Sequence, residues 1–245
     1  MLLKVCLNGG RAVRDHPSIP VTPARLSDEA RRSVEAGAGA VHLHPRDESG
    51  AETLAAAEVG AAVRAVREAC GAPTGVSTGA WIEADPERRV ALIRGWAELL
   101  PGERPDFASV NLFEEGWEAV CGALFDAGIG VEAGLWSADD ARRFVAADLA
   151  GRCLRVLLEP VRESSAADAL AAAREMDRIL DGAGVDTPRL LHGKDATAWP
   201  VLRRAAAEGY GQRIGFEDTL TLPHGEPAHD NAQLVSAATG GAAPR

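Results

Sequence analysis

The sequence predicts an α/β fold, a single-domain (β/α)8 barrel of the TIM-barrel class, on three observations. The chain has 245 residues, the length typical of one such barrel. Eight short apolar segments rich in β-branched residues alternate with Ala-, Arg- and Glu-rich segments whose apolar residues recur at helical spacing. This alternation runs through residues 1–245 with no linker or shift in composition, which favours one closed domain over two.

The expected strands are short apolar runs that lead into polar or turn-forming residues. They span residues 2–8, 40–44, 74–78, 107–112, 130–136, 155–160, 189–193 and 213–218. A doubly wound open sheet is the alternative, but it usually has fewer units and a Gly-rich phosphate-binding turn after its first strand. The sequence Asn8-Gly9-Gly10-Arg11 does not match that turn, so we favour the barrel.

Several of the eight expected helices have recognisable start signals. Thr22-Pro23 and Ser27 lie near the start of the first helix, Asp85-Pro86 near the third and Ser137 near the fifth. Ser, Thr and Asp side chains cap helix N-termini, and proline suits the first turn. The eighth helix is expected near residues 228–239, followed by Gly240-Gly241.

Composition excludes several classes of partner. The 26 Lys and Arg residues against 36 Asp and Glu residues give a net charge of −10, and a field of that sign repels nucleic acids and anionic membranes. No apolar run approaches the roughly 20 residues that span a bilayer. The apolar part of the N-terminal segment is too short for a signal peptide, so we expect a cytoplasmic protein. The four cysteines form no CxxC pair and are expected to be reduced thiols.

Two histidines end the second expected strand. Side chains at i and i+2 of a strand point to the same side, so His42 and His44 present two imidazoles together. In a barrel, active-site groups come from the carboxyl ends of the strands, which favours metal ligands. The alternative is a pair of core histidines hydrogen-bonded to their neighbours.

The eighth expected strand supplies a candidate carboxylate ligand. A catalytic zinc commonly has two His ligands, one carboxylate ligand and an open position. Glu217 lies at the carboxyl end of this strand, with Arg213 on the same face and Asp218 where the strand breaks. Adjacent carboxylates are costly to bury unless they are paired or bind a metal. A structural salt bridge from Arg213 to Glu217 or Asp218 is the alternative, and it is compatible with a metal site.

Other strand ends add polar residues to the expected mouth of the barrel. They are Ser77, Thr78, Gly79, Asn111, Glu132, Glu159, His192 and Lys194. The backbone N–H groups of the Ser77-Thr78-Gly79 turn can hold a carboxylate, although an ordinary strand-to-helix turn has the same sequence. Trp81 and Trp136 lie near strand ends and are candidates for substrate contact.

The chain resembles the β-keto acid cleavage enzymes, the family that includes 3-keto-5-aminohexanoate cleavage enzyme. The resemblance rests on VHLHPRD (41–47) and RIGFEDTLTLPHGEPAHDNAQLV (213–235), and PSIPVTP (17–23), the STG turn and SVNL (109–112) support it. It implies a divalent metal, usually zinc, held by His42, His44 and Glu217. It also implies Arg213 and Asp218 as catalytic residues.

The predicted site extends beyond the metal ligands and the Arg213–Asp218 pair. The resemblance implies that Ser77 binds substrate. We add Glu132 to the catalytic residues, because it is what remains here of the family's PExExFD segment. We add four further polar or turn residues as substrate-binding candidates: Asn8, Thr78, Gly79 and Asn111.

The resemblance also implies the reaction, a Claisen-type exchange with acetyl-CoA as co-substrate. The zinc-bound β-keto acid becomes nucleophilic, attacks acetyl-CoA and collapses by retro-Claisen cleavage to acetoacetate and a new acyl-CoA. The Arg213/Asp218 pair would remove the α-proton. Relatives are commonly tetramers, so we expect a homo-oligomer that acts on a small β-keto acid.

Departures from the family pattern bear on the substrate. The family's early acidic residue falls here on Gly10 or Arg11. Arg11 and Arg14 in place of acidity favour a substrate more anionic than an amino-keto acid. Tight loops at several strand ends leave little chain to grip a CoA tail, so the use of acetyl-CoA stays open.

Two rival functions remain. One is a metal-dependent hydrolase or lyase on a TIM barrel, although the amidohydrolase type has its HxH motif on the first strand and needs His ligands on strands five and six, which have none here. The other is a non-catalytic barrel that binds a small acid, because fold does not dictate function.

Overall fold

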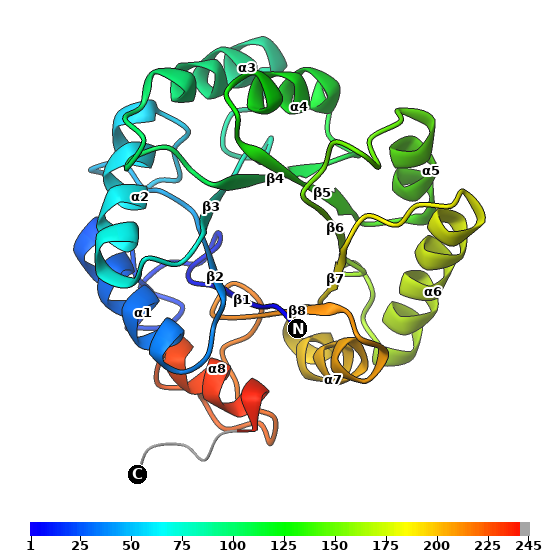
Figure 1. Cartoon of the computed structure of the whole chain (residues 1–245). Helices are drawn as coiled ribbons and strands as arrows, with labels where there is room; N and C mark the ends of the chain where they lie inside the picture. The colour runs from blue at the N-terminus through cyan, green and yellow to red at the C-terminus, as the bar shows by residue number, and fades with distance from the viewer. Residues whose placement is uncertain (241–245) are drawn as a thin grey trace.

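The structure, a computed structural model that describes residues 1–240, is a closed barrel of eight parallel strands ringed by helices (Figure 1). The strands are β1 (Leu3–Cys6), β2 (Ala40–Leu43), β3 (Thr74–Ser77), β4 (Phe107–Asn111), β5 (Gly130–Leu135), β6 (Arg155–Leu158), β7 (Arg189–Leu191) and β8 (Gly211–Ile214). The helices are α1 (Pro23–Glu35), α2 (Ala56–Cys70), α3 (Pro86–Arg94), α4 (Trp117–Asp126), α5 (Ala138–Ala146), α6 (Ala166–Gly182), α7 (Ala198–Glu208) and α8 (Asn231–Thr239). Two short 3-10 helices span Gly95–Glu98 and Asp195–Thr197.

Each strand pairs with the next along the chain, and β8 pairs with β1 to close the barrel. Alternate strand residues such as Val5, Val41, Val76 and Val131 are fully buried in one apolar layer with the inner faces of the helices. The residues between them point into the barrel, as the period of two in a strand requires. The predicted (β/α)8 architecture is therefore confirmed.

The helix start signals match the structure with one exception. Thr22, Asp85 and Ser137 are N-caps whose side chains accept hydrogen bonds from backbone N–H groups of the first turn. Ser27 instead lies inside α1, where its hydroxyl donates to the Ala24 carbonyl at 2.9 Å. The eighth helix begins at Asn231, later than expected, and ends at Thr239 with Gly240 as its C-cap, while Gly241 lies outside the described residues.

The predicted boundaries of the eighth strand are wrong, because β8 ends at Ile214 rather than at residue 218. A side chain on Gly215 would collide with the backbone of Cys6 in β1, so only glycine allows this close approach. The chain then turns, and the N–H groups of Asp218 and Thr219 donate to the Gly215 carbonyl at 2.9 and 3.0 Å. Glu217 and Asp218 consequently lie on a turn beyond the strand.

A charged cluster fills part of the barrel interior. Lys4 and Glu132 are fully buried, with 2.5 Å between Nζ and Oε2, and Arg155 Nε lies 3.2 Å from the other carboxylate oxygen. Both cations also lie over the Phe107 ring, at 5.7 and 5.4 Å from its centroid. A side chain on Gly75 would collide with that ring, so the glycine makes room for it. Glu132 therefore balances two cations inside the barrel.

Burial also determines the character of the cysteines, all of which are free thiols in the structure. Desolvation raises the pKa of Cys6 well above its usual value and raises the pKa values of Cys121 and Cys153 to about 12. These thiols are poor nucleophiles.

Among the helices of residues 1–240, none combines the length and the apolar character that a membrane-spanning helix requires.

We expect Glu132→Gln to destabilise the protein by roughly 3–5 kcal/mol, because it leaves the Lys4 and Arg155 charges buried without a counter-charge. Urea unfolding monitored by circular dichroism measures the loss. Glu175→Gln is the matched control, because Glu175 pairs with Arg178 on the surface and its loss should cost no more than about 0.5 kcal/mol. Equal unfolding midpoints for the two variants would contradict the prediction.

Candidate active site

The two histidines of β2 converge at the carboxyl end of the barrel. His42 is in β2 and His44 lies just beyond its last residue, and both rings are almost completely buried. Their centroids are 5.2 Å apart at an interplanar angle of 80°. Asn8 holds the His44 backbone, since its amide oxygen accepts from the His44 N–H at 2.9 Å and its amide nitrogen donates to the His44 carbonyl at 2.9 Å. Asn8 therefore positions the second histidine.

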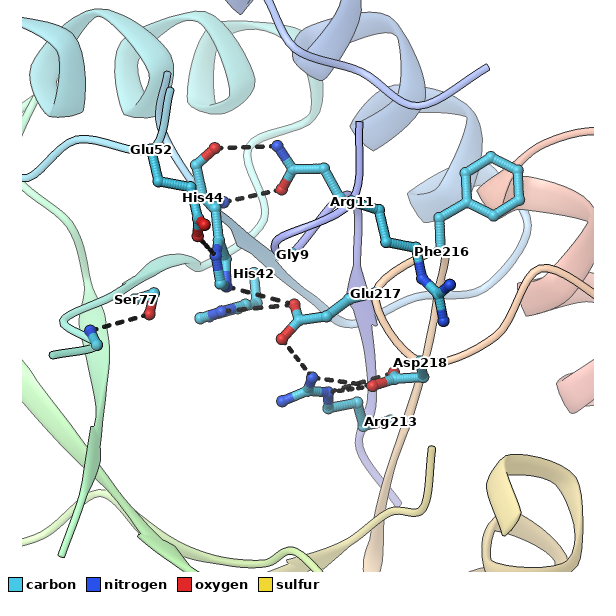
Figure 2. Close-up of polar contacts among 12 residues, drawn as sticks. Gly9, Arg11, His42, His44, Glu52, Ser77, Arg213, Phe216, Glu217 and Asp218 are labelled. Atoms are coloured by element: carbon cyan, nitrogen blue, oxygen red, sulfur yellow. Dashed lines mark hydrogen bonds and ion pairs between the residues drawn. The ribbon is translucent and has the colours of Figure 1, made fainter. Parts of the chain in front are cut away.

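Glu217 reaches the same point from the turn after β8. Its Oε2 lies 3.5 Å from His44 Nε2 and 3.8 Å from His42 Nε2 (Figure 2). A side chain on Gly9 would collide with the Glu217 side chain, and Gly9 also has a positive φ of 55°. Glycine at this position lets the carboxylate approach the imidazoles.

These residues fit a divalent cation. One ligand atom from each of His42, His44 and Glu217 lies within 4.8 Å of the other two. Ligands bound at about 2.1 Å in a tetrahedron lie about 3.4 Å apart, close to the observed spacing. Glu217 Oε2 is buried and accepts no hydrogen bond from any residue in the described range 1–240. Two imidazoles, one carboxylate and an unpartnered oxygen form a donor set that suits zinc.

The charges of the three groups are strongly coupled. Burial lowers the pKa of His42 well below its usual value, so this imidazole is neutral. Burial opposes the charged form of His44, but Glu217 and Glu52 outweigh it and raise its pKa to about 9. Burial would raise the pKa of Glu217, yet Arg213 and the two histidines hold it well below its usual range. The carboxylate is therefore ionised.

Glu52 is a site residue that sequence reasoning missed. Its Oε1 lies 2.5 Å from His44 Nδ1, so the other ring nitrogen faces Glu217, and it accepts a hydrogen bond from Trp81 Nε1 at 3.1 Å. The hairpin between Arg46 and Glu52 returns the chain beside His44. The turn sequence Asp47-Glu48-Ser49-Gly50 is the signal that predicts this return.

Arg213 and Asp218 form the second half of the site. Arg213 Nε donates to the Asp218 carboxylate at 3.0 and 3.2 Å, and its Nη2 lies 2.6 Å from Glu217 Oε1 (Figure 2). The salt bridges weighed as an alternative are thus present, together with the candidate metal ligands. Burial raises the pKa of Asp218, against the opposing charges of Arg213 and His192. The pKa values of the two adjacent carboxyl groups are therefore shifted in opposite directions.

A cavity of about 580 Å³ opens over these groups. Residues that line it include His44, Glu217, Arg213, Asp218, Glu159 and His192. His192 Nε2 lies 2.9 Å from Glu159 Oε2, and its Nδ1 is 3.6 Å from Asp218 Oδ1. Burial would raise the pKa of Glu159, but His192 and Arg213 lower it overall, so this carboxylate is ionised. Trp81 and Trp136 also line the cavity, as does Lys194.

Three of the expected substrate-binding residues do not line this cavity. Their side chains instead form hydrogen bonds with other residues of the protein. Ser77 Oγ accepts from the Gly79 N–H at 3.2 Å, and Thr78 Oγ1 donates to the Ser109 carbonyl at 2.7 Å. Asn111 donates to Glu114 at 2.8 Å. These contacts stabilise the turns after β3 and β4.

Glu132, expected among the catalytic residues, lies in the barrel interior rather than at the cavity. It is 0% exposed because Lys4 and Arg155 enclose it.

Gly79 leaves room for the Trp81 ring, since a side chain at this position would collide with that ring. Asn8 holds the His44 backbone and does not line the cavity.

Arg11 reaches the cavity, whereas Arg14 does not. Arg11 lines the cavity and pairs with Asp195 at 2.5 Å, linking the segment after β1 to the segment after β7. The Arg14 side chain is 84% exposed and lies 3.9 Å from Asp15. Only one of the two arginines can therefore contact a ligand in the cavity.

Comparisons with known proteins identify the family of this chain. A model of the beta-keto acid cleavage enzyme family matches residues 1–147 and 156–243. A 3-keto-5-aminohexanoate cleavage enzyme of Acetoanaerobium sticklandii is 21% identical over 244 residues, covering 96% of this chain and 89% of that protein. The enzyme of the same name from Fusobacterium nucleatum is 28% identical over 71 residues, covering 29% of this chain and 26% of that protein.

Solved structures share the fold. ObcA in complex with oxaloacetate superposes with a TM-score of 0.75 at 17% identity, over 91% of this chain and 63% of ObcA, so the chain spans less than two thirds of ObcA. An N-acetylmannosamine-6-phosphate 2-epimerase of Clostridium perfringens superposes with a TM-score of 0.58 at 14% identity, over 89% of this chain and 87% of the epimerase. From the extent of the family match, the chain belongs to the beta-keto acid cleavage enzyme family.

Proposed function

We propose that this protein is a zinc-dependent β-keto acid cleavage enzyme that exchanges acyl groups between a β-keto acid and acetyl-CoA. The observation that carries the proposal is that His44 and Glu217 of the His42–His44–Glu217 cluster line one cavity together with the ion-paired carboxyl group of Asp218. When bound by His42, His44 and Glu217, a divalent cation supplies a Lewis acid for the keto oxygen of the substrate.

Asp218 is suited to the proton transfer that the reaction needs. Burial raises the pKa of Asp218 toward the range that suits a base operating near neutral pH. Arg213 holds both carboxylate oxygens through Nε, which orients the group and balances its charge. Asp218 takes the α-proton. Arg213 remains protonated throughout, because burial would lower its pKa but the neighbouring carboxylates outweigh burial and raise it.

Each of the two steps of the exchange forms one bond and breaks one. The α-carbon, after losing its proton to Asp218, bonds to the acetyl carbonyl and the CoA thiolate leaves. The thiolate then attacks the original keto carbonyl, and the bond between that carbon and the α-carbon breaks. Return of the proton from Asp218 gives acetoacetate and the new acyl-CoA.

The CoA co-substrate has support from a structural relative. ObcA has been solved as a ternary complex with a C4-CoA adduct and oxalate, and it shares the barrel with this chain at a TM-score of 0.75. Lys194 at the rim of the cavity is exposed and presents a cation to an anionic ligand. We propose further that the enzyme is a cytoplasmic homo-oligomer, a tetramer as the family resemblance implies.

We propose an anionic β-keto acid as the substrate. Arg11 lines the cavity, and a substrate carboxylate can take the place of Asp195 on its guanidinium group. Asp195 is 63% exposed, so it can turn to water when it is displaced. The oxaloacetate bound to ObcA is a keto acid with two carboxylates, which is the chemistry that this arrangement favours.

Purified protein is expected to contain about one zinc per chain, and His42→Ala and Glu217→Ala are expected to lose it. The reason is that ligands from β2 and from the turn after β8 must hold the same ion. Elemental analysis measures the content, with His224→Ala as the control because His224 is exposed on a loop. Absence of metal from the wild type, or its retention in both ligand variants, would sink the metal assignment.

Asp218→Asn is expected to lower kcat by about 100-fold or more while leaving the zinc content unchanged, because it removes the base but no ligand. The assay measures acetoacetate formed from acetyl-CoA and a β-keto acid. A variant that retains the wild-type rate would exclude Asp218 as the base.

Arg11→Glu is expected to reduce the preference for 3-oxoadipate over 3-oxohexanoate by roughly 10-fold or more, since these acids differ only in a terminal carboxylate. The ratio of kcat/KM values measures the preference. Arg14→Glu introduces the same charge change outside the cavity and should leave the ratio near that of the wild type. Similar ratios in the two variants would contradict the role of Arg11.

A further inference from the structure

Asn231, the first residue of α8, is 0% exposed and is fully hydrogen-bonded. Its Oδ1 accepts from the Phe216 N–H at 2.7 Å, and its Nδ2 donates to the Leu7 carbonyl at 3.1 Å. Both Nδ2 and the backbone N–H donate to Glu29 Oε2, at 3.0 and 3.1 Å. One amide side chain thus joins the ends of β1 and β8 to α1.

These bonds form a continuous path between two of the candidate metal ligands. The Leu7 N–H donates to the His42 carbonyl at 2.9 Å, and the carbonyl of the same residue accepts from Asn231. Asn231 then accepts from Phe216, whose neighbour in the chain is Glu217. Figure 2 shows the Phe216 side chain directed away from the ligand cluster and the Glu217 side chain directed into it.

The turn after β8 needs a residue such as Asn231 because the regular hydrogen bonding of the sheet ends at Ile214. After β8 ends at Ile214, the Glu217 N–H still donates to the Cys6 carbonyl at 3.2 Å, but the Phe216 N–H lies in the buried region where the turn leaves the strand. Without Asn231 this N–H would lose its acceptor, which is costly in a buried position. The turn would then be held to β1 on one side only.

Glu29 fixes which way the amide faces. A flipped amide would place its oxygen against the Leu7 carbonyl and the Glu29 carboxylate, and its NH2 group against the Phe216 N–H. Arg32, one turn along α1, pairs with Glu29 and with Asp230 and so balances the carboxylate. The Asn231 Oδ1 atom therefore faces the turn that carries Glu217, and the amide nitrogen faces away from it.

We propose that Asn231 is a positioning residue that places the Glu217 carboxylate opposite His42 and His44, with Glu29 orienting its amide. The proposal rests on the metal site of the proposed function. It assigns a role to the segment HDNAQLV, which contributes no group to the cavity.

The test uses Asn231→Ala in the full chain, with Val235→Ala on the same helix as a matched core truncation that removes no hydrogen bond. Zinc affinity is measured by competition with a chromophoric chelator. The expected result is a loss of roughly 10-fold or more for Asn231→Ala, beyond any loss in Val235→Ala. The visible spectrum of the Co²⁺-loaded protein is expected to change in the first variant only. Equal affinities and spectra in the two variants would overturn the proposal.

Hydrogen–deuterium exchange of the segment 215–218 provides a readout that needs no metal. Faster exchange is expected in Asn231→Ala and wild-type exchange in Val235→Ala. A wild type that binds no zinc contradicts the proposed function, and exchange at this segment then decides the present inference alone. Unchanged protection in Asn231→Ala would overturn it.

A double variant guards against loss of folding in Asn231→Ala. In Glu29→Gln/Asn231→Asp the new carboxylate on α8 still accepts from the Phe216 N–H, and the glutamine amide introduced on α1 can donate to that carboxylate. Partial recovery of both exchange protection and zinc affinity relative to Asn231→Ala is expected, because the second oxygen of the introduced carboxylate faces the Leu7 carbonyl, which loses its donor. A folded double variant that recovers neither would contradict the role of the Phe216 bond.

Discussion

The β8–β1–β2 seam brings Glu217 to His42 and His44, which lie 175 and 173 positions before it in the sequence. β8 pairs with β1 at Arg213 and Lys4, and β1 pairs with β2 at Cys6 and His42. The carboxylate after β8 and the imidazoles of β2 can therefore meet only when the barrel is closed. Most of the site depends on this seam: Gly9 clears space for Glu217, Gly215 lets the turn leave β8 against Cys6, and Asn8 fixes the backbone of His44.

Two neighbouring carboxyl groups acquire different chemistry from their surroundings. Glu217 faces two imidazoles and Arg213, so its pKa is held low and it remains a ligand. Asp218 has Arg213 and a more distant His192, and burial raises its pKa. A pair of titratable groups whose environments separate their pKa values is the arrangement that acid–base enzymes use to give like residues unlike tasks.

The sequence alone predicted the parts of the fold and site that depend on local periodicity. The alternation of strands and helices predicted the barrel, and the i, i+2 spacing placed His42 and His44 on one side of β2. Glu132 was expected at the mouth of the barrel but lies deeper, because Lys4 and Arg155 from β1 and β6 enclose it in the interior. Likewise, Glu52 joins the site through a hairpin, and β8 ends early because of a contact between Gly215 and another strand. Such contacts between distant segments cannot be predicted from the local periodicity of the sequence.

Closure by the last strand has a consequence for synthesis on the ribosome. Until β8 emerges, β1 is the open edge of a growing parallel sheet, and such an edge invites pairing with another chain. Lys4 points into the barrel from that edge, and an inward-pointing charge discourages foreign strands from docking there. The lysine that pairs with Glu132 in the finished barrel therefore also places on the β1 edge a charge of the kind that disfavours edge-to-edge pairing.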